Sequence, residues 1–128
     1  MALRRPPHSR RTLANQKEIE AVCSEAGFEP IDPGRLSLDE QIELFRSTRY
    51  IVAEHGSACA NIIFRRGAQL SMIELFPPDY DSTAFYLNCR HLGFSHTLLR
   101  GSPVADGCSS WRMSPEKLRS ALIAMLDP

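Results

Sequence analysis

The chain has 128 residues, a length that fits one domain, and 43% of them are hydrophobic, which supplies enough apolar side chains for a folded core. Its 15 basic and 15 acidic residues cancel to a formal net charge of +0. This neutral charge argues against a general nucleic-acid or membrane-surface binder. No stretch is apolar enough to span a bilayer, and no apolar core follows the N-terminal arginines as it would in a secretory signal. We therefore expect a cytoplasmic protein with no membrane span and no nucleic-acid partner.

The first part of the chain predicts helices and strands from apolar spacing and end signals. Apolar side chains recur at the helical period over residues 19–26, and Gly27 follows them as a C-terminal glycine. The short apolar run Phe28–Ile31 predicts a buried strand. Ser37 and Glu40 have the spacing of a capping box, so we expect a second helix to begin there.

The same alternation continues through the rest of the chain. It predicts, in order, a strand at Tyr50–Ala53, a helix over residues 57–64 ended by Gly67, a strand at Leu70–Phe76, a helix at Thr83–Leu92, a strand at Phe94–Leu99, a loop at Arg100–Met113 and a final helix from Ser114–Pro115. Short, mostly apolar strands between helices indicate an α/β domain whose parallel sheet is covered on both faces. We expect Tyr50–Ala53 and Leu70–Leu75 to be neighbouring central strands.

Parallel sheets of this kind bind ligands at the carboxyl ends of their strands. The rule indicates three places in this sequence: the segment before Asn15, the turn Glu54–Ser57 and the strand end Glu74–Phe76. We therefore look for binding chemistry in these segments first.

The turn Glu54–Ser57 offers the clearest chemistry. Gly56 lets a ligand approach the backbone and permits a positive φ, and the helix that follows presents free N–H groups to a phosphate. The hydroxyl of Ser57 adds a contact, and His55 can donate to a phosphate or act as a base. The alternative is that His55 only caps the turn, because single histidines are often structural.

Basic residues gather in the N-terminal segment 1–14, ahead of the first acidic residue, Glu18. Arg10 and Arg11 belong to this cluster. Arginine side chains match phosphate oxygens and neutralise the charge of a diphosphate leaving group. The alternative is a solvated, frayed terminus.

Two further polar residues are candidates. Glu74 can accept both hydroxyls of a ribose, or it can form a surface salt bridge. Asn61 lies four residues after Ser57 on the same face of the expected helix, so it either contacts a ligand or is exposed without a role. The cysteines show no CxxC spacing, so we expect no metal site and no cofactor. His55 and Ser57 do not have the order of a hydrolase triad.

Several segments together resemble glycosyltransferase family 61. Residues 54–61, with Phe64, Gly67 and Ile73–Leu75, are similar to the family's HGAGLxN…F…G…xxEL signature. Upstream, residues 10–16 resemble its RR…NE segment. The runs 27–29 and 36–41 resemble its GFE…LSxxEQ segment. The likeness extends over roughly the first hundred residues, and it depends on the order and spacing of all these pieces.

The resemblance implies both a fold and an activity. The family's enzymes are two-domain glycosyltransferases of the GT-B type, which transfer a sugar from a nucleotide-sugar donor to a glycan or protein acceptor with inversion; bacterial relatives act in capsular polysaccharide synthesis. This chain, residues 1–128, would be the Rossmann-like, three-layer C-terminal domain, with the N-terminal acceptor-binding domain absent or supplied separately. His55 would be the catalytic residue. The donor would contact Arg10, Arg11, Asn15, His55, Gly56, Ser57, Asn61 and Glu74.

Two residues depart from the family pattern. Gln16 stands where the family's NE pair has its glutamate, and Ser57 stands where the family has an alanine after the HG pair. An alternative function is therefore a non-catalytic nucleotide-binding or assembly module that keeps only the fold.

Overall fold

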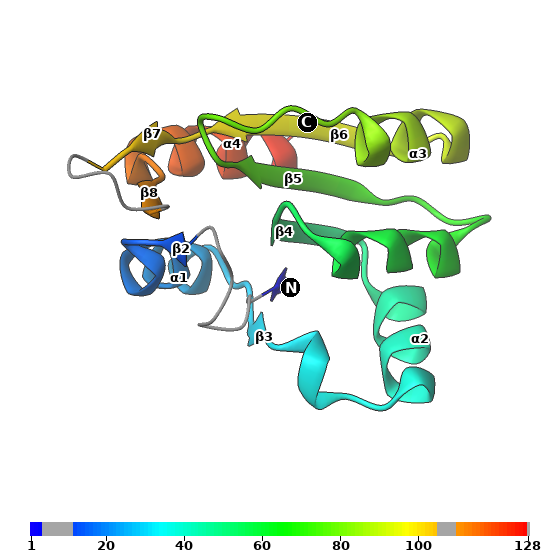
Figure 1. The fold of residues 1–128 in the computed structure, drawn as a ribbon. Coiled ribbons are helices and arrows are strands. Elements are labelled where there is room, and N and C mark those ends of the chain that lie inside the picture. The colour runs from blue at the N-terminus through cyan, green and yellow to red at the C-terminus, as the bar shows by residue number, and fades with distance from the viewer. Residues whose placement is uncertain (4–11, 105–109, 128) are drawn as a thin grey trace.

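The computed structural model describes residues 1–3, 12–104 and 110–127 (Figure 1). Its centre is a five-stranded sheet of parallel pairs in the order β3-β1-β4-β5-β6. The strands are β1 (Ala2–Leu3), β3 (Pro30–Ile31), β4 (Tyr50–Glu54), β5 (Ser71–Phe76) and β6 (Ser95–Arg100). The prediction that the strands at Tyr50–Ala53 and Leu70–Leu75 are central neighbours is confirmed, because β4 pairs with β5 inside the sheet.

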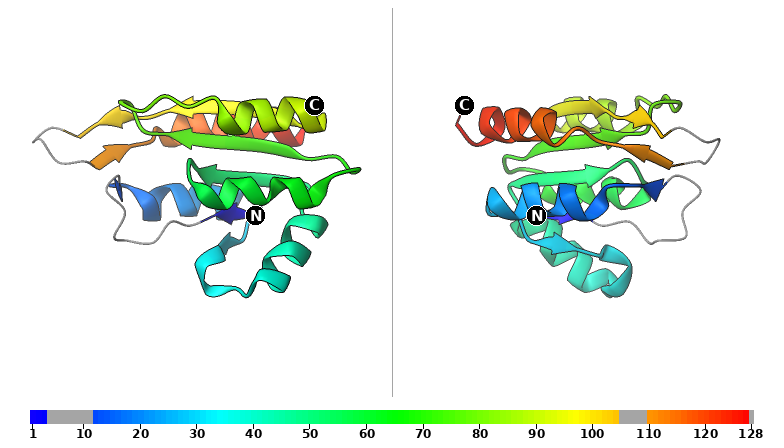
Figure 2. Two further views of the ribbon diagram at one scale, coloured as in Figure 1. Left: turned by 45° about the vertical axis from the view of Figure 1, so that its right-hand side comes forward. Right: turned by 90° about the vertical axis from the view of Figure 1, so that its left-hand side faces the viewer.

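Helices cover both faces of this sheet (Figure 2). They are α1 (Gln16–Glu25), the 3-10 turn η1 (Pro33–Arg35), α2 (Leu38–Ser47), the 3-10 helix η2 (Ser57–Arg65), α3 (Ala84–Leu92) and α4 (Pro115–Leu126). One core lies under α1 and α4 and includes Ile73 and Leu75 of β5. The other lies under α2, η2 and α3 and includes Met72 of the same strand. Successive side chains of a strand point to opposite faces, so one apolar strand serves both cores. The predicted α/β, Rossmann-like, three-layer domain is confirmed.

The predicted helix ends are also observed. The Ser37 backbone N–H donates to Glu40 Oε2 at 2.7 Å and the Glu40 N–H donates to Ser37 Oγ at 3.3 Å, so the capping box opens α2. Gly27 has a φ of 82° just after α1, in the left-handed region that glycine adopts without steric cost. The helix expected over residues 57–64 forms, but as the 3-10 helix η2.

The predicted loop at Arg100–Met113 is wrong in part. It contains β7 (Ser102–Pro103) and β8 (Ser110–Arg112), which form a second sheet with β2 (Thr12–Leu13) in the order β2-β8-β7. Strands of two or three residues are too short to show an alternating pattern. What holds β8 in place is the burial of Trp111, which is 2% exposed in the α1 and α4 core.

The strand β1 was also not predicted. It pairs with β3 and β4 and so lies inside the sheet, within the segment that the sequence analysis treats only as a basic N-terminal region. The connections from β1 and β4 leave the sheet on opposite faces, since α1 follows β1 and η2 follows β4. The gap between the carboxyl ends of β1 and β4 is therefore a topological switch point, where open α/β sheets bind ligands.

Two other expectations concern the chemistry of the chain. Cys23, Cys59 and Cys89 are free and buried, as predicted, while Cys108 lies outside the described residues. None of the helices within residues 1–3, 12–104 and 110–127 combines the length and apolarity needed to cross a bilayer.

Candidate functional site

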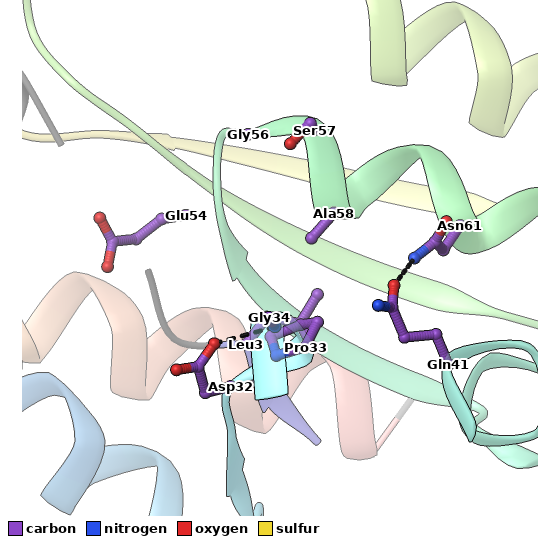
Figure 3. A pocket seen from close by; sticks show the side chains of 10 residues that line it. All are labelled: Leu3, Asp32, Pro33, Gly34, Gln41, Glu54, Gly56, Ser57, Ala58 and Asn61. Carbon is purple, nitrogen blue, oxygen red and sulfur yellow. Dashed lines mark hydrogen bonds between the residues drawn. The ribbon is translucent and has the colours of Figure 1, made fainter. Parts of the chain in front are cut away.

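A pocket of about 360 Å³ opens at the switch point between β1 and β4 (Figure 3). Leu3 at the end of β1 and Glu54 at the end of β4 line it from the sheet. The other lining residues come from η1, α2 and the start of η2: Asp32, Pro33, Gly34, Gln41, Gly56, Ser57, Ala58 and Asn61. Pockets that bind small molecules commonly enclose about 300–1,000 Å³, so this volume suits a compact ligand.

The first turn of η2 lines the pocket with groups that can bind an anion. The first N–H groups of a helix have no acceptor within the helix, and they carry the positive end of its dipole. Gly56 is the N-cap of η2, and because it has no side chain it leaves these N–H groups uncapped; Ser57 is the first residue of the helix. Both residues line the pocket, so a phosphate placed here would meet backbone donors and a hydroxyl.

The expected positive φ at Gly56 is not observed. Its φ is 177° and its ψ is 170°, which is extended backbone that any residue adopts. The argument for glycine at this position is therefore the close approach that a missing side chain allows.

The far wall of the pocket is formed by an amide pair, visible on the right of Figure 3. Asn61 Nδ2 donates to Gln41 Oε1 at 2.8 Å, and Gln41 Nε2 donates to the carbonyl oxygen of Leu36 at 3.2 Å. On the η1 side, Asp32 Oδ1 accepts from the Gly34 N–H at 3.0 Å. These contacts hold amide and carboxylate groups at the wall, where they can be directed at a polar ligand.

A second polar group lies beside the same turn but outside the pocket. His55 Nδ1 is 2.5 Å from Glu74 Oε1, and His96 Nε2 is 2.8 Å from Glu74 Oε2. The side chain of Glu74 is 1% exposed, that of His96 is 5% exposed and that of His55 is 11% exposed. We call these three residues the His–Glu–His row. An ionised carboxylate only accepts, so a carboxylate here requires a proton on His55 Nδ1 and leaves Nε2 as the free nitrogen of a neutral ring.

Aromatic rings surround the imidazole of His55. Its ring centroid lies 4.4 Å from that of Phe76, 5.0 Å from that of Tyr80 and 5.2 Å from that of Phe85. The rings restrict the orientation of the imidazole and lower the local dielectric, which strengthens the contact with Glu74.

The loop that carries Tyr80 over His55 is tied down by Arg100 at the end of β6. Arg100 Nη1 donates to the carbonyl oxygens of Tyr80 and Pro78 at 3.0 and 3.2 Å, and Nη2 donates to Asp81 Oδ1 at 2.6 Å. The ring of Tyr80 is thereby held against the imidazole.

The structure separates the residues that the sequence groups together. Gly56, Ser57 and Asn61 line the pocket, whereas His55 and Glu74 pair with each other on the β5 side of the turn. Glu74 lies inside β5, and both of its oxygens contact histidines. In this arrangement the carboxylate faces imidazoles where the sequence analysis expected ribose hydroxyls.

Asn15 and the two arginines have different outcomes. Asn15 is 7% exposed; its Nδ2 donates to the carbonyl oxygen of Met113 at 2.9 Å and its Oδ1 accepts from the Met113 N–H at 3.1 Å. These contacts join the start of α1 to the segment that precedes α4, a structural role. Arg10 and Arg11 lie outside the described residues.

Sequence reasoning missed His96, Gln41 and Asp32. Gln41 and Asp32 form part of the pocket wall. His96 stands in β6, where its immediate neighbours are exposed, but its own side chain is 5% exposed. The available signal was the spacing within β5 and β6, since a parallel register places His96 beside Met72 and therefore near Glu74.

No group of three or more His, Cys, Asp or Glu side chains in the described parts of the chain is arranged to hold a metal ion. The His–Glu–His row is a linear chain of hydrogen bonds in which Glu74 stands between the two rings.

Comparison with known proteins identifies the family of the chain. No curated protein matches the sequence. The sequence model of the family described as Glycosyltransferase 61 matches residues 1–72, which is more than half of the 128 residues. The match contains the pocket and His55 but ends two residues before Glu74. The chain belongs to the Glycosyltransferase 61 family.

Proposed function

We propose that this chain is the donor-binding domain of an inverting glycosyltransferase of the GT-B type. It binds a nucleotide-sugar in the pocket at the switch point, and the sugar passes to a glycan or protein acceptor held by a second domain. The observation that carries the proposal is the pocket itself. It lies between the carboxyl ends of β1 and β4 and is lined by Gly56, Ser57 and Ala58 at the start of η2.

The pocket offers different chemistry to the two ends of a nucleoside diphosphate. The start of η2 at Gly56 and Ser57 suits the diphosphate, because free N–H groups and the helix dipole favour negative charge. The amide pair of Asn61 and Gln41 suits the base, because amides both donate and accept hydrogen bonds. Arg10 and Arg11 remain our candidates for further diphosphate contacts.

His55 is our candidate for the catalytic role. In an inverting transfer the acceptor oxygen forms a bond to the anomeric carbon while the bond from that carbon to the diphosphate breaks. The electron pair leaves with the diphosphate, and the acceptor hydroxyl gives up its proton. A neutral His55 can take that proton at Nε2, and a protonated His55 can stabilise the charge that grows on the diphosphate.

Glu74 acts on His55 in this proposal. When Glu74 is ionised, its contact with Nδ1 at 2.5 Å keeps the ring proton of a neutral His55 on Nδ1, and it stabilises the imidazolium when that forms. This replaces the ribose contact expected from the sequence, since a side chain that is 1% exposed has little access to a ligand.

A bulky substitution tests the pocket. Ser57 and Ala60 are both exposed on η2, but only Ser57 lines the pocket, so Ser57→Trp and Ala60→Trp form a matched pair. We expect uridine or guanosine diphosphate to bind the full chain in calorimetry. The dissociation constant should rise at least about tenfold in Ser57→Trp, a loss of about 1.4 kcal/mol, and remain unchanged in Ala60→Trp. If neither nucleotide binds the wild-type chain, or if both variants bind as the wild type does, the proposal is wrong.

A further inference from the structure

The His–Glu–His row crosses three neighbouring strands on the η2 and α3 face of the sheet. His55 follows β4, Glu74 belongs to β5 and His96 belongs to β6. In the register of the sheet, Glu74 pairs with Ala53 and His96 pairs with Met72, so the row runs diagonally from the carboxyl end of β4 into β6. His96 lies outside the segment that matches the family.

The buried carboxylate needs both of its partners. Glu74 shares its face of the sheet with the core that contains Met72 and Cys89, where an ion without hydrogen bonds is costly. When Glu74 is ionised both of its oxygens accept, so His55 Nδ1 donates to Oε1 and His96 Nε2 donates to Oε2. Without the donor at position 96, Oε2 would be left in apolar surroundings, and the carboxyl group would be favoured in its protonated, neutral form.

Protonation of Glu74 would change the nitrogen that His55 presents. A carboxylate accepts from His55 Nδ1, so the ring proton stays on Nδ1 and Nε2 keeps its lone pair. A protonated carboxyl donates to Nδ1, so the ring proton moves to Nε2. The same nitrogen then changes from acceptor to donor, although no residue next to it has changed.

We propose that His96 is a positioning residue that acts on His55 through Glu74: by donating to Glu74 Oε2 it keeps the carboxylate ionised and the proton of His55 on Nδ1. The inference rests on the proposed function for its meaning in catalysis, but the tautomer of His55 can be measured without a substrate. It assigns a role to a histidine in β6, the strand at the edge of the sheet.

Several other groups face the row. From α3, the thiol of Cys89 lies near Glu74, and burial, with the negative charge of Glu74, raises its pKa to about 11, so it stays neutral. The phenol ring of Tyr86, also from α3, meets the His96 ring edge-on at 5.9 Å. The Tyr80 ring meets His55 at 5.0 Å, and the Arg100 guanidinium lies 5.7 Å from the Phe76 ring centroid.

Two substitutions, His96→Gln and His96→Asn, test the role of His96, because their side-chain amides extend to different distances from the backbone. The amide nitrogen of Gln occupies the position of imidazole Nε2, whereas the amide nitrogen of Asn stops near Nδ1, short of Glu74. The full chain would be labelled with ¹⁵N in the histidine rings and ¹³C at the glutamate carboxyls. NMR spectra near pH 7 would then report the tautomer of His55 and the charge of Glu74 in the wild type, His96→Gln and His96→Asn. Uridine and guanosine diphosphate affinities would be measured on the same samples.

We expect the wild type and His96→Gln to hold the proton of His55 on Nδ1 with Glu74 ionised. His96→Asn should move that proton to Nε2 and protonate Glu74, while nucleotide affinity stays within about twofold because His96 does not line the pocket. A wild-type spectrum with the proton on Nε2 alone would overturn the inference, and so would folded His96→Asn in which the tautomer of His55 is unchanged or both ring nitrogens are protonated beside an ionised Glu74, whether or not nucleotide binds. Absence of nucleotide binding in the wild type would instead overturn the proposed function and leave the tautomer result standing.

Discussion

The contact between Glu74 and His55 should be one of the strongest polar interactions in the domain, and a double-mutant cycle can measure it. The two side chains are 1% and 11% exposed, and Nδ1 lies 2.5 Å from Oε1. Hydrogen bonds to charged groups contribute about 1.5–3 kcal/mol, while ion pairs at the surface contribute about 0.2–1 kcal/mol. Because water cannot screen this contact, we expect a coupling energy of about 1.5–3 kcal/mol.

The cycle compares the wild type, Glu74→Gln, His55→Ala and the double variant. Free energies of unfolding come from urea denaturation followed by circular dichroism. Glu74→Gln alone should lower the free energy of unfolding by about 1–3 kcal/mol, since the amide presents an N–H₂ group to one of two imidazole donors.

The control cycle uses an exposed pair of similar length. Arg119 Nη2 lies 2.7 Å from Glu25 Oε2, but these side chains are 48% and 62% exposed. The coupling in Arg119→Met and Glu25→Gln should stay within about 1 kcal/mol. If the Glu74–His55 coupling is below about 0.5 kcal/mol, no larger than that of the exposed pair, the carboxylate does not hold the imidazole and our account of His55 is refuted.

Three further outcomes can be checked. Gly56→Val should leave the melting temperature nearly unchanged, because the φ of 177° suits valine, and should abolish nucleotide binding in calorimetry by filling the approach to the backbone; normal binding would exclude this part of the pocket. Gly101→Ala should lower the free energy of unfolding by about 1–3 kcal/mol, because a Cβ there would lie 2.3 Å from the Trp111 ring; an equally stable variant in urea denaturation would contradict the packing. Burial raises the pKa of Cys89 from 9.0 to about 11, so the unfolded chain loses its thiol proton first and stability should fall as the pH rises from 9 to 11. The fall should be less steep in Cys89→Ala, and equal slopes would contradict it.

The central elements could be predicted because their signals are local and strong. The near-continuous apolar runs of β4 and β5 indicate strands covered on both faces, and they are neighbours in the sheet. The capping box and the glycines fix helix ends through backbone chemistry that needs no tertiary contact. The strand β1, with two residues, has no pattern to detect, and it is a strand only because β3 and β4 lie on either side of it.

The site was less predictable because it depends on the direction of side chains. The Gly56–Ser57 turn was identified correctly as a feature at the carboxyl edge, since a strand, a glycine and a helix follow one another in the sequence. The end of the predicted strand at Phe76 was correct, but Glu74 lies two residues before that end and points into the core on the same face as Met72. Asn15 matches a family motif, but its side chain forms hydrogen bonds with the backbone of Met113, a residue 98 positions away in the sequence.

The turn at Glu54–Ser57 contributes residues both to the pocket and to the His–Glu–His row. Its backbone and Ser57 serve the pocket, while the side chain of His55 leaves the turn on the β5 side and belongs to the His–Glu–His row. Both parts begin at the end of β4, but they depend on different contacts: the pocket on residues of β1, η1, α2 and η2, and the row on Glu74 of β5 and His96 of β6. Changes at Gly56 or Ser57 should therefore act on nucleotide affinity, and changes at Glu74 or His96 on the proton of His55. A variant without an N–H donor in the place of His96 would need another donor for the buried carboxylate, or a neutral side chain in its place.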